Sequence, residues 1–133
     1  MHLHSRFAVQ MASLVVLASL CLAADKKQLS DAFAAVDANL KTTVGKQYDE
    51  EIGKEFLSKY LASIKQCKQS ASGTSMDSFD ILQKLNRGGK VEEILVYPET
   101  PIATCTRDTL VTGAFSPPPH DHYWVNIHMQ LKH

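Results

Sequence analysis

No charge of one sign predominates in this sequence, which carries fourteen basic and fourteen acidic residues among 133. A strongly basic surface is the usual electrostatic mark of proteins that bind nucleic acids or anionic membranes. The balanced charge therefore predicts a protein whose partners are neither nucleic acid nor an anionic membrane surface. The length suits one domain and is too short for two ordinary ones.

The sequence has only one long apolar run, from Phe7 to Leu22, and this run is shorter than the roughly 20 residues that a membrane-spanning helix needs. A short polar leader with Arg6 precedes the run, and the small residues Ala23 and Ala24 follow it. This three-part layout predicts a signal peptide over residues 1–23, cleaved after Ala23 or Ala24. The alternative is a retained anchor. We expect a periplasmic or secreted protein with no membrane attachment after cleavage.

Cysteine is scarce, with three residues in the chain. Cys21 lies in the predicted signal peptide, which leaves Cys67 and Cys105. An even number of cysteines in an oxidising compartment favours a disulfide, here closing a 38-residue loop and adding about 3–4 kcal/mol of stability. Two free thiols or a metal pair are the alternatives. Two thiols fall short of the four ligands that a structural zinc ion takes.

Recognisable catalytic patterns are missing. No serine lies at a strand-to-helix turn of the kind that presents a nucleophile. The neighbouring carboxylates Glu50-Glu51 and Glu92-Glu93 point apart on a helix or a strand, so neither forms a converging pair. Gly88-Gly89 is not followed by a helix and is therefore no phosphate loop. We expect no catalytic residue and no cofactor, and predict that the protein is not an enzyme.

Histidines cluster near the end of the chain, at His120, His122, His128 and His133. On an extended strand, His122 and His128 are roughly 20 Å apart at 3.3 Å per residue, so they cannot share a metal ion. His120 and His122 with Asp121 remain as a candidate set, which offers fewer ligands than an ordinary site. We expect no metal site, and a metal-binding protein built on these histidines is the less favoured alternative.

Two segments of the first half carry helical periodicity. Residues 30–40 place apolar side chains at helical spacing, with the serine at position 30 as the expected N-cap. Over residues 48–64, apolar side chains recur every four positions, and Leu57 and Leu61 are expected to broaden this face. The second helix fits either a partner or a sheet. The sheet is favoured, because a small domain needs this face for its core.

The second half predicts three strands and a short helix. Residues 79–85 alternate as a strand, with the odd-numbered positions on the buried face. Residues 86–89 predict a tight turn, and residues 91–97 predict the returning strand, with a bulge where two glutamates break its alternation. A helix is expected over residues 100–110, because threonine and proline stand at its start. A final strand is expected over residues 123–131.

The final strand is the predicted recognition element. Its odd-numbered residues are apolar and predict a core face, whereas Trp124, Asn126 and His128 point to the other face. We predict that these three residues contact a protein partner, with strand addition as the expected mode. For Trp124 a second interpretation is equally favoured, in which the ring packs under the N-terminal helix. Aromatic residues are common at the centres of interfaces, so both interpretations stay open.

Several short motifs of the second half follow one another in a characteristic order. They are Gly88-Gly89-Lys90-Val91, Ile94-Leu95-Val96, the helix through Leu110, Phe115-Ser116-Pro117-Pro118 and Val125-Asn126-Ile127-His128-Met129. Over residues 79–131 this order resembles the C-terminal domain of the energy transducer TonB. The resemblance implies a periplasmic domain of helices on a three-stranded sheet. It also implies an edge strand that pairs with a partner's extended segment.

Together these patterns predict an α+β fold in which N-terminal helices pack on a three-stranded antiparallel sheet with one short crossing helix. The expected organisation is a signal peptide over 1–23, a helical segment and linker over 24–75, and a β-β-α-β segment over 76–133. The last two are expected to form one globular domain. The predicted function is a small exported protein-interaction module without catalysis or energy transduction. A secreted inhibitor or structural domain is the alternative.

Overall fold

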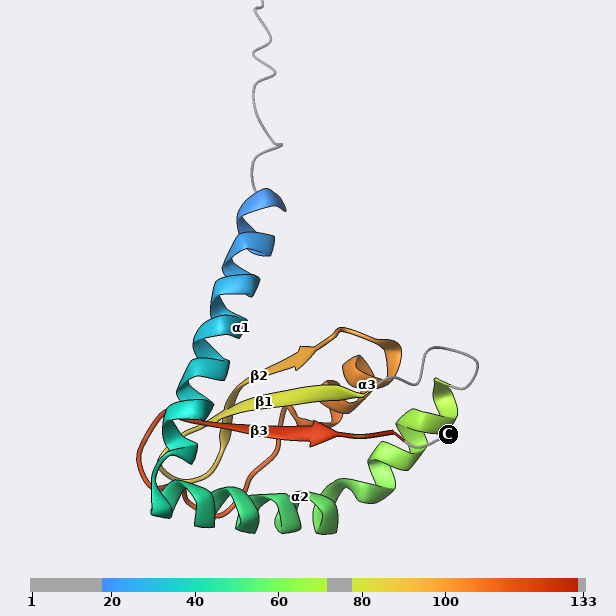
Figure 1. Ribbon diagram of the computed structural model, residues 1–133. Coiled ribbons are helices and arrows are strands. Elements are labelled where there is room, and N and C mark those ends of the chain that lie inside the picture. Colours follow the sequence, from blue (N-terminus) through green and yellow to red (C-terminus); the bar gives the residue numbers. More distant parts are fainter. Residues whose placement is uncertain (1–17, 72–77, 132–133) are drawn as a thin grey trace, which may run out of the picture.

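The computed structural model describes residues 18–71 and 78–131, with side chains from Lys26 onward. Over these residues it forms an α+β fold of helices packed on an antiparallel sheet, which confirms the predicted class (Figure 1). Most of the predicted signal peptide lies outside the described residues, and its expected cleavage point falls within the first helix. The elements are α1 Ala18–Leu40, α2 Thr43–Ser70, β1 Phe79–Leu85, β2 Val91–Tyr97, α3 Pro101–Leu110 and β3 Tyr123–Met129.

The corner between α1 and α2 is set by Thr42 and Gly45. Thr42 caps α2, because its hydroxyl accepts a hydrogen bond from the Gly45 N–H at 2.9 Å. A Cβ on Gly45 would lie only 1.9 Å from the Asn39 carbonyl oxygen, so glycine permits the close approach of the two helices. The expected N-cap at Ser30 is wrong: Ser30 lies inside α1, because no glycine or proline interrupts the preceding turns.

The sheet has the strand order β2-β1-β3, so β1 is central and both β2 and β3 are edges. Both neighbouring pairs are antiparallel. The predicted bulge is confirmed: the register of β1 with β2 shifts between Lys84 and Leu85, and Glu92 is the extra residue. Gly89 supplies the positive φ of 89° that the hairpin turn needs.

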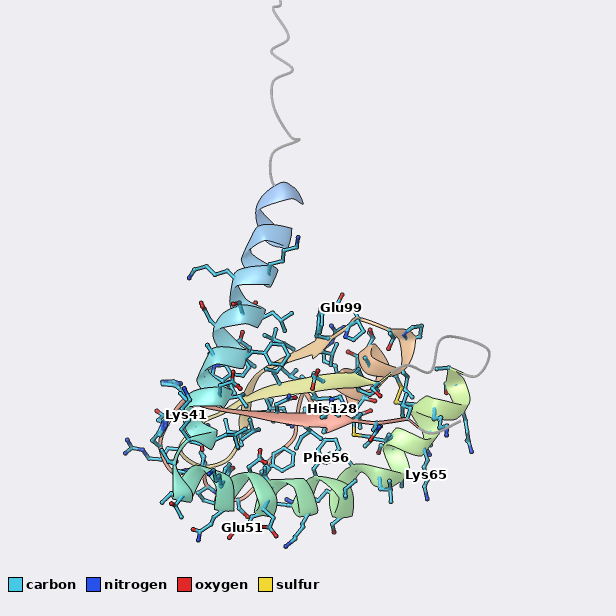
Figure 2. The ribbon with its side chains drawn as sticks, in the orientation of Figure 1. Lys41, Glu51, Phe56, Lys65, Glu99 and His128 are labelled. Atoms are coloured by element: carbon cyan, nitrogen blue, oxygen red, sulfur yellow. A yellow bond between two sulfur atoms is a disulfide. The ribbon has the colours of Figure 1, made fainter. Side chains whose placement is uncertain are left out.

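The two faces of the sheet are covered differently. One face carries the main core against α2 and α3, and the other is crossed by α1, whose N-terminal turns extend beyond the sheet (Figure 1). Figure 2 shows Phe56 between α2 and the sheet, where its side chain is fully buried. Gln83 also points into this core, as the alternation of β1 predicted. Among the described residues, no helix combines the length and apolarity needed to cross a membrane.

A disulfide joins Cys67 in α2 to Cys105 in α3, which confirms the predicted pairing. The two Cα atoms are 5.7 Å apart, within the usual range for a disulfide. Cys67 is buried beside the main core, whereas Cys105 is partly exposed. The bond therefore fastens the C-terminal part of the long helix to the short helix that follows β2.

Candidate functional site

The side chain of Trp124 lies under α1 and is half-buried there. It packs against a small cluster that includes Val36 of α1 and Leu82 of β1. The Lys84 ammonium lies 5.6 Å from the centre of the indole ring, within the range of a cation–π contact. The sequence left two interpretations open for Trp124. The structure shows the one in which the ring packs under the N-terminal helix. The indole ring is therefore engaged in holding α1 on the sheet.

The backbone of Trp124 reveals which groups of β3 face outward. The Asn39 side chain donates a hydrogen bond to the Trp124 carbonyl oxygen at 3.0 Å, so this carbonyl points away from β1. In an antiparallel pair, residues whose N–H and C=O face the neighbouring strand alternate with residues whose groups face away. Asn126 and His128 therefore turn their N–H and C=O groups to the open edge. Among the described residues these backbone groups have no hydrogen-bond partner.

The side chains of Asn126 and His128 meet on one carboxylate. Asn126 Nδ2 donates to Asp80 Oδ1 at 2.9 Å, and His128 Nδ1 lies 2.9 Å from the same oxygen. Asp80 lies directly opposite His128 in the register of β1 and β3. The structure thus brings together two of the three predicted partner-binding residues. Asp80 holds both side chains on the sheet face, and the backbone groups at the edge of β3 stay open.

A groove runs between the open edge of β3 and α2, with a volume of about 370 Å³. Figure 2 shows one of its residues, His128, on β3 above the long helix. The groove is lined from β3 by four consecutive residues and from α2 by six. They are Asn126, Ile127, His128 and Met129, and Asp49, Glu50, Gly53, Lys54, Phe56 and Leu57. An unpaired strand edge therefore faces a helix wall across open space.

Gly53 and Leu57 shape the helix wall of this groove. A Cβ placed on Gly53 would meet no atom within 4 Å, so glycine leaves space at the middle of the wall. Leu57 is 51% exposed, and Leu61 one turn later is also exposed. The expectation that these two leucines broaden the buried face is wrong. Only the neighbouring stripe with Ile52 and Phe56 enters the core, and the leucines lie beside it.

Asp49 stands at the end of the groove near the start of β3. Its carboxylate is half-buried and also borders a small hollow with Trp124 and Val125. Burial raises the pKa of Asp49. The neighbouring Glu50 is paired with Lys54 at 2.9 Å, whereas Asp49 has neither a hydrogen bond nor an ion pair with any residue of the described ranges.

The second edge of the sheet, β2, also borders a groove. Its volume is about 490 Å³, and its walls come from Leu29 of α1, Tyr97 of β2 and the paired side chains Glu99 and Arg107. The first part of this edge is already covered, because the Val91 N–H donates to the Gly113 carbonyl at 3.1 Å. Among the described residues, the one carboxylate that lines this groove, Glu99, is paired with Arg107, so the groove lacks the electrostatic feature of the β3 groove.

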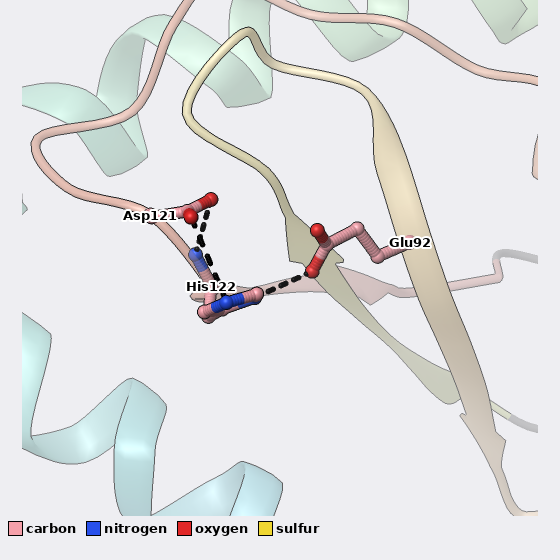
Figure 3. A group of neighbouring side chains, drawn as sticks. All are labelled: Glu92, Asp121 and His122. Carbon is pink, nitrogen blue, oxygen red and sulfur yellow. Dashed lines mark hydrogen bonds and ion pairs between the residues drawn. The ribbon is translucent and has the colours of Figure 1, made fainter.

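A third feature is the group formed by Glu92, Asp121 and His122 (Figure 3). His122 Nδ1 lies 2.8 Å from Glu92 Oε2, and His122 Nε2 lies 3.6 Å from Asp121 Oδ2. Asp121 Oδ1 also accepts a hydrogen bond from the Arg87 N–H at 2.8 Å, which ties this turn to the β1–β2 hairpin. Because each ring nitrogen faces a different carboxylate, the imidazole separates the two acids. The arrangement suits a protonated imidazole better than a shared metal ion.

The charges around His122 shift two pKa values. The hydrogen bond with Glu92 and the charge of Asp121 raise the pKa of His122. The Arg87 N–H lowers the pKa of Asp121.

We expect the Glu92→Gln substitution to lower the pKa of His122, because an amide of the same size removes the negative charge. Titration of the imidazole by NMR measures this, and an unchanged pKa would contradict the arrangement.

The raised pKa of His122 determines whether its contribution to stability rises or falls with pH. Because the folded-state pKa of His122 is raised, its contribution is complete below the ordinary value of 6.5 and is lost as the pH rises through the raised pKa. The His122→Asn variant keeps a residue type that tolerates the φ of 51°. We expect it to lower the melting temperature more at pH 6 than at pH 8.5. Equal lowering at both pH values would count against the ion pairs.

The sequence predicted β3 as the recognition element. It did not predict that residues of α2 line the other side of the groove. Asp49, Gly53 and Leu57 belong to the groove because α2 runs beside the β3 edge, and this contact joins segments more than sixty residues apart. A glycine in the middle of a long helical pattern was the one available signal, because it lowers helix stability without an evident local reason.

Comparisons of this chain with family models, with curated proteins and with solved structures gave no match. The likeness of residues 79–131 to the TonB C-terminal domain therefore stays a prediction.

Proposed function

We propose that this chain is a small, exported, non-catalytic protein-interaction module that binds an extended segment of a partner protein along the β3 edge. The observation that carries the proposal is the set of outward-facing backbone groups of Asn126 and His128, which border an open groove. Strand edges with unpaired N–H and C=O groups readily accept another strand. The α2 wall would hold the added segment from its other side.

The dimensions of the groove set the length of the bound segment. Asp49 and Leu57 are eight residues apart on α2, which is about 12 Å along a helix. An extended chain covers that distance with about four residues. Four backbone hydrogen bonds contribute about 2–6 kcal/mol before the cost of association. We therefore expect reversible binding whose strength depends on side-chain contacts with the helix wall.

Export is the second part of the proposal. The predicted signal peptide over residues 1–23 supports it, as does the Cys67–Cys105 disulfide, because such bonds persist mainly in oxidising compartments. The resemblance of residues 79–131 to a periplasmic domain supports the same placement. Cell fractionation with N-terminal sequencing tests it, and the expected result is a periplasmic or secreted chain that begins at Ala24 or Asp25.

Binding at the edge is tested with random ten-residue peptides displayed on phage and selected on the purified protein. We expect His128→Pro to weaken binding of the selected peptides at least tenfold. Proline removes an outward N–H without taking a bond from the β1–β3 ladder. His128→Ala is the matched control, since it removes the same imidazole but keeps the N–H. It should retain most of the affinity.

Gly53 gives an independent test of the groove. Gly53→Phe places a ring in the open space beside β3 and should prevent peptide binding while the protein stays folded. Gly53→Ala is its control and should bind peptides while raising stability by about 0.5–1 kcal/mol. If the selected peptides bind His128→Pro and Gly53→Phe as well as the parent protein, the β3 edge is not the binding site.

A further inference from the structure

We propose that the segment bound at the β3 edge carries a lysine or arginine side chain, and that Asp49 receives it at the end of the groove near the start of β3. This inference rests on the proposed function and specifies the chemistry of the partner. It would make the module selective for basic extended segments. Backbone pairing alone gives no such selectivity, because every residue other than proline offers the same N–H and C=O groups.

The first support is that the carboxylate of Asp49 lacks a counter-charge. It is half-buried and has no hydrogen bond or ion pair within the part of the chain that the structure describes. Lys54, the lysine that lines this groove, is held by Glu50 at 2.9 Å. A carboxylate that has lost part of its hydration gains more from an arriving cation than a fully solvated one does.

The second support is the position of Asp49 relative to the open edge. Asp49 lines the groove together with Asn126, and it also borders the hollow beside Trp124 and Val125. α2 and β3 run in the same direction, so Leu57 and Met129 lie toward the opposite end (Figure 1). A segment paired with β3 would therefore place a basic side chain near Asn126. Its apolar side chains would lie near Leu57, about two to four residues away.

The third support is the contrast with the remainder of the groove. Glu50 is a neighbouring carboxylate that is exposed and already paired, so it offers little to a new cation. His128 is engaged with Asp80 on the sheet face. Gly53 contributes no side chain at all. Asp49 is thus the charged side chain in this groove that has no hydrogen bond or ion pair in the described ranges, and its charge acts on the uncharged phenol of Tyr123.

The experiment compares three synthetic versions of a phage-selected peptide, with lysine, norleucine or glutamate at the position nearest Asp49. Dissociation constants are measured for the parent protein, for Asp49→Asn and for Glu50→Gln. We expect the lysine peptide to bind the parent protein about fivefold to tenfold more tightly than the norleucine peptide. Asp49→Asn should remove this difference, and Glu50→Gln should keep it. The preference should also weaken as the salt concentration rises.

The outcomes separate this inference from the proposed function. Asp49 does not select a basic segment if Asp49→Asn keeps the preference for lysine, or if the norleucine and glutamate peptides bind the parent protein as tightly as the lysine peptide does. In either case edge binding still stands. If Gly53→Phe leaves all three peptides bound, edge binding itself fails. If the free protein forms a dimer that the peptide dissociates, the natural occupant is a second copy of this chain and the proposal of a basic partner segment is overturned.

Discussion

Replacing Cys67 and Cys105 together with alanine is expected to lower the free energy of unfolding by about 3–4 kcal/mol. The disulfide closes a loop of 38 residues, so removing it gives the unfolded chain many more conformations. It also fastens α2 to α3, which are otherwise held together by apolar packing. Urea unfolding of residues 24–133 measures the change. A loss of this size is a large part of the stability of a domain of about 110 residues.

Reduction supplies the control for the double variant. The parent protein with its disulfide reduced should unfold at nearly the same urea concentration as the alanine variant, because both lack the same cross-link. Oxidised, unfolded residues 24–133, which exclude Cys21, should show no thiol that reacts with a colorimetric reagent. A double variant within 1 kcal/mol of the parent protein, or two reactive thiols, would show that the bond contributes little or does not form.

Phe56→Ala is expected to lower the free energy of unfolding by about 3–5 kcal/mol. The ring of Phe56 is fully buried between α2 and the sheet and lies 5.7 Å from the ring of Tyr60. Truncating it removes a large apolar side chain and leaves a cavity that the packed elements fill only in part. Thermal and urea unfolding both measure this loss. Stability should fall, and peptide binding should weaken as well, because Phe56 also lines the groove beside β3.

Leu57→Ala is the matched comparison, one residue further along the same helix. Leu57 is 51% exposed, so its truncation should change stability by no more than about 0.5 kcal/mol. It should weaken binding of a β3-edge peptide, because Leu57 lines the groove. Equal stability losses for Phe56→Ala and Leu57→Ala would contradict the placement of α2.

Much of this fold is readable from local patterns. Alternation marked β1 and β3, the paired glutamates marked the bulge in β2, and Thr100-Pro101 marked the start of α3. These features depend on neighbours within a few residues, where the period of two and the demands of turns and caps act. The disulfide followed from the number of cysteines rather than from their positions.

Other features depend on how distant segments meet, and local patterns do not contain that information. By spacing, Leu57 was expected to broaden the apolar face that contains Phe56, yet only Phe56 enters the core and Leu57 stays 51% exposed. The choice for Trp124 depended on where α1 crosses the sheet, which no residue near Trp124 specifies. Asp49 joined the candidate site for the same reason. A carboxylate on an amphipathic helix ordinarily faces solvent.

Hydrogen exchange of the β3 amides tests the central claim most directly, since it reports on each backbone N–H separately. In the free protein, the amides of Asn126 and His128 should exchange fast, whereas those of Val125 and Ile127 should be protected by pairing with β1. With a selected peptide bound, Asn126 and His128 should become protected as well. Protection of these two amides in the free protein, or their continued fast exchange with peptide bound, would contradict strand addition at this edge.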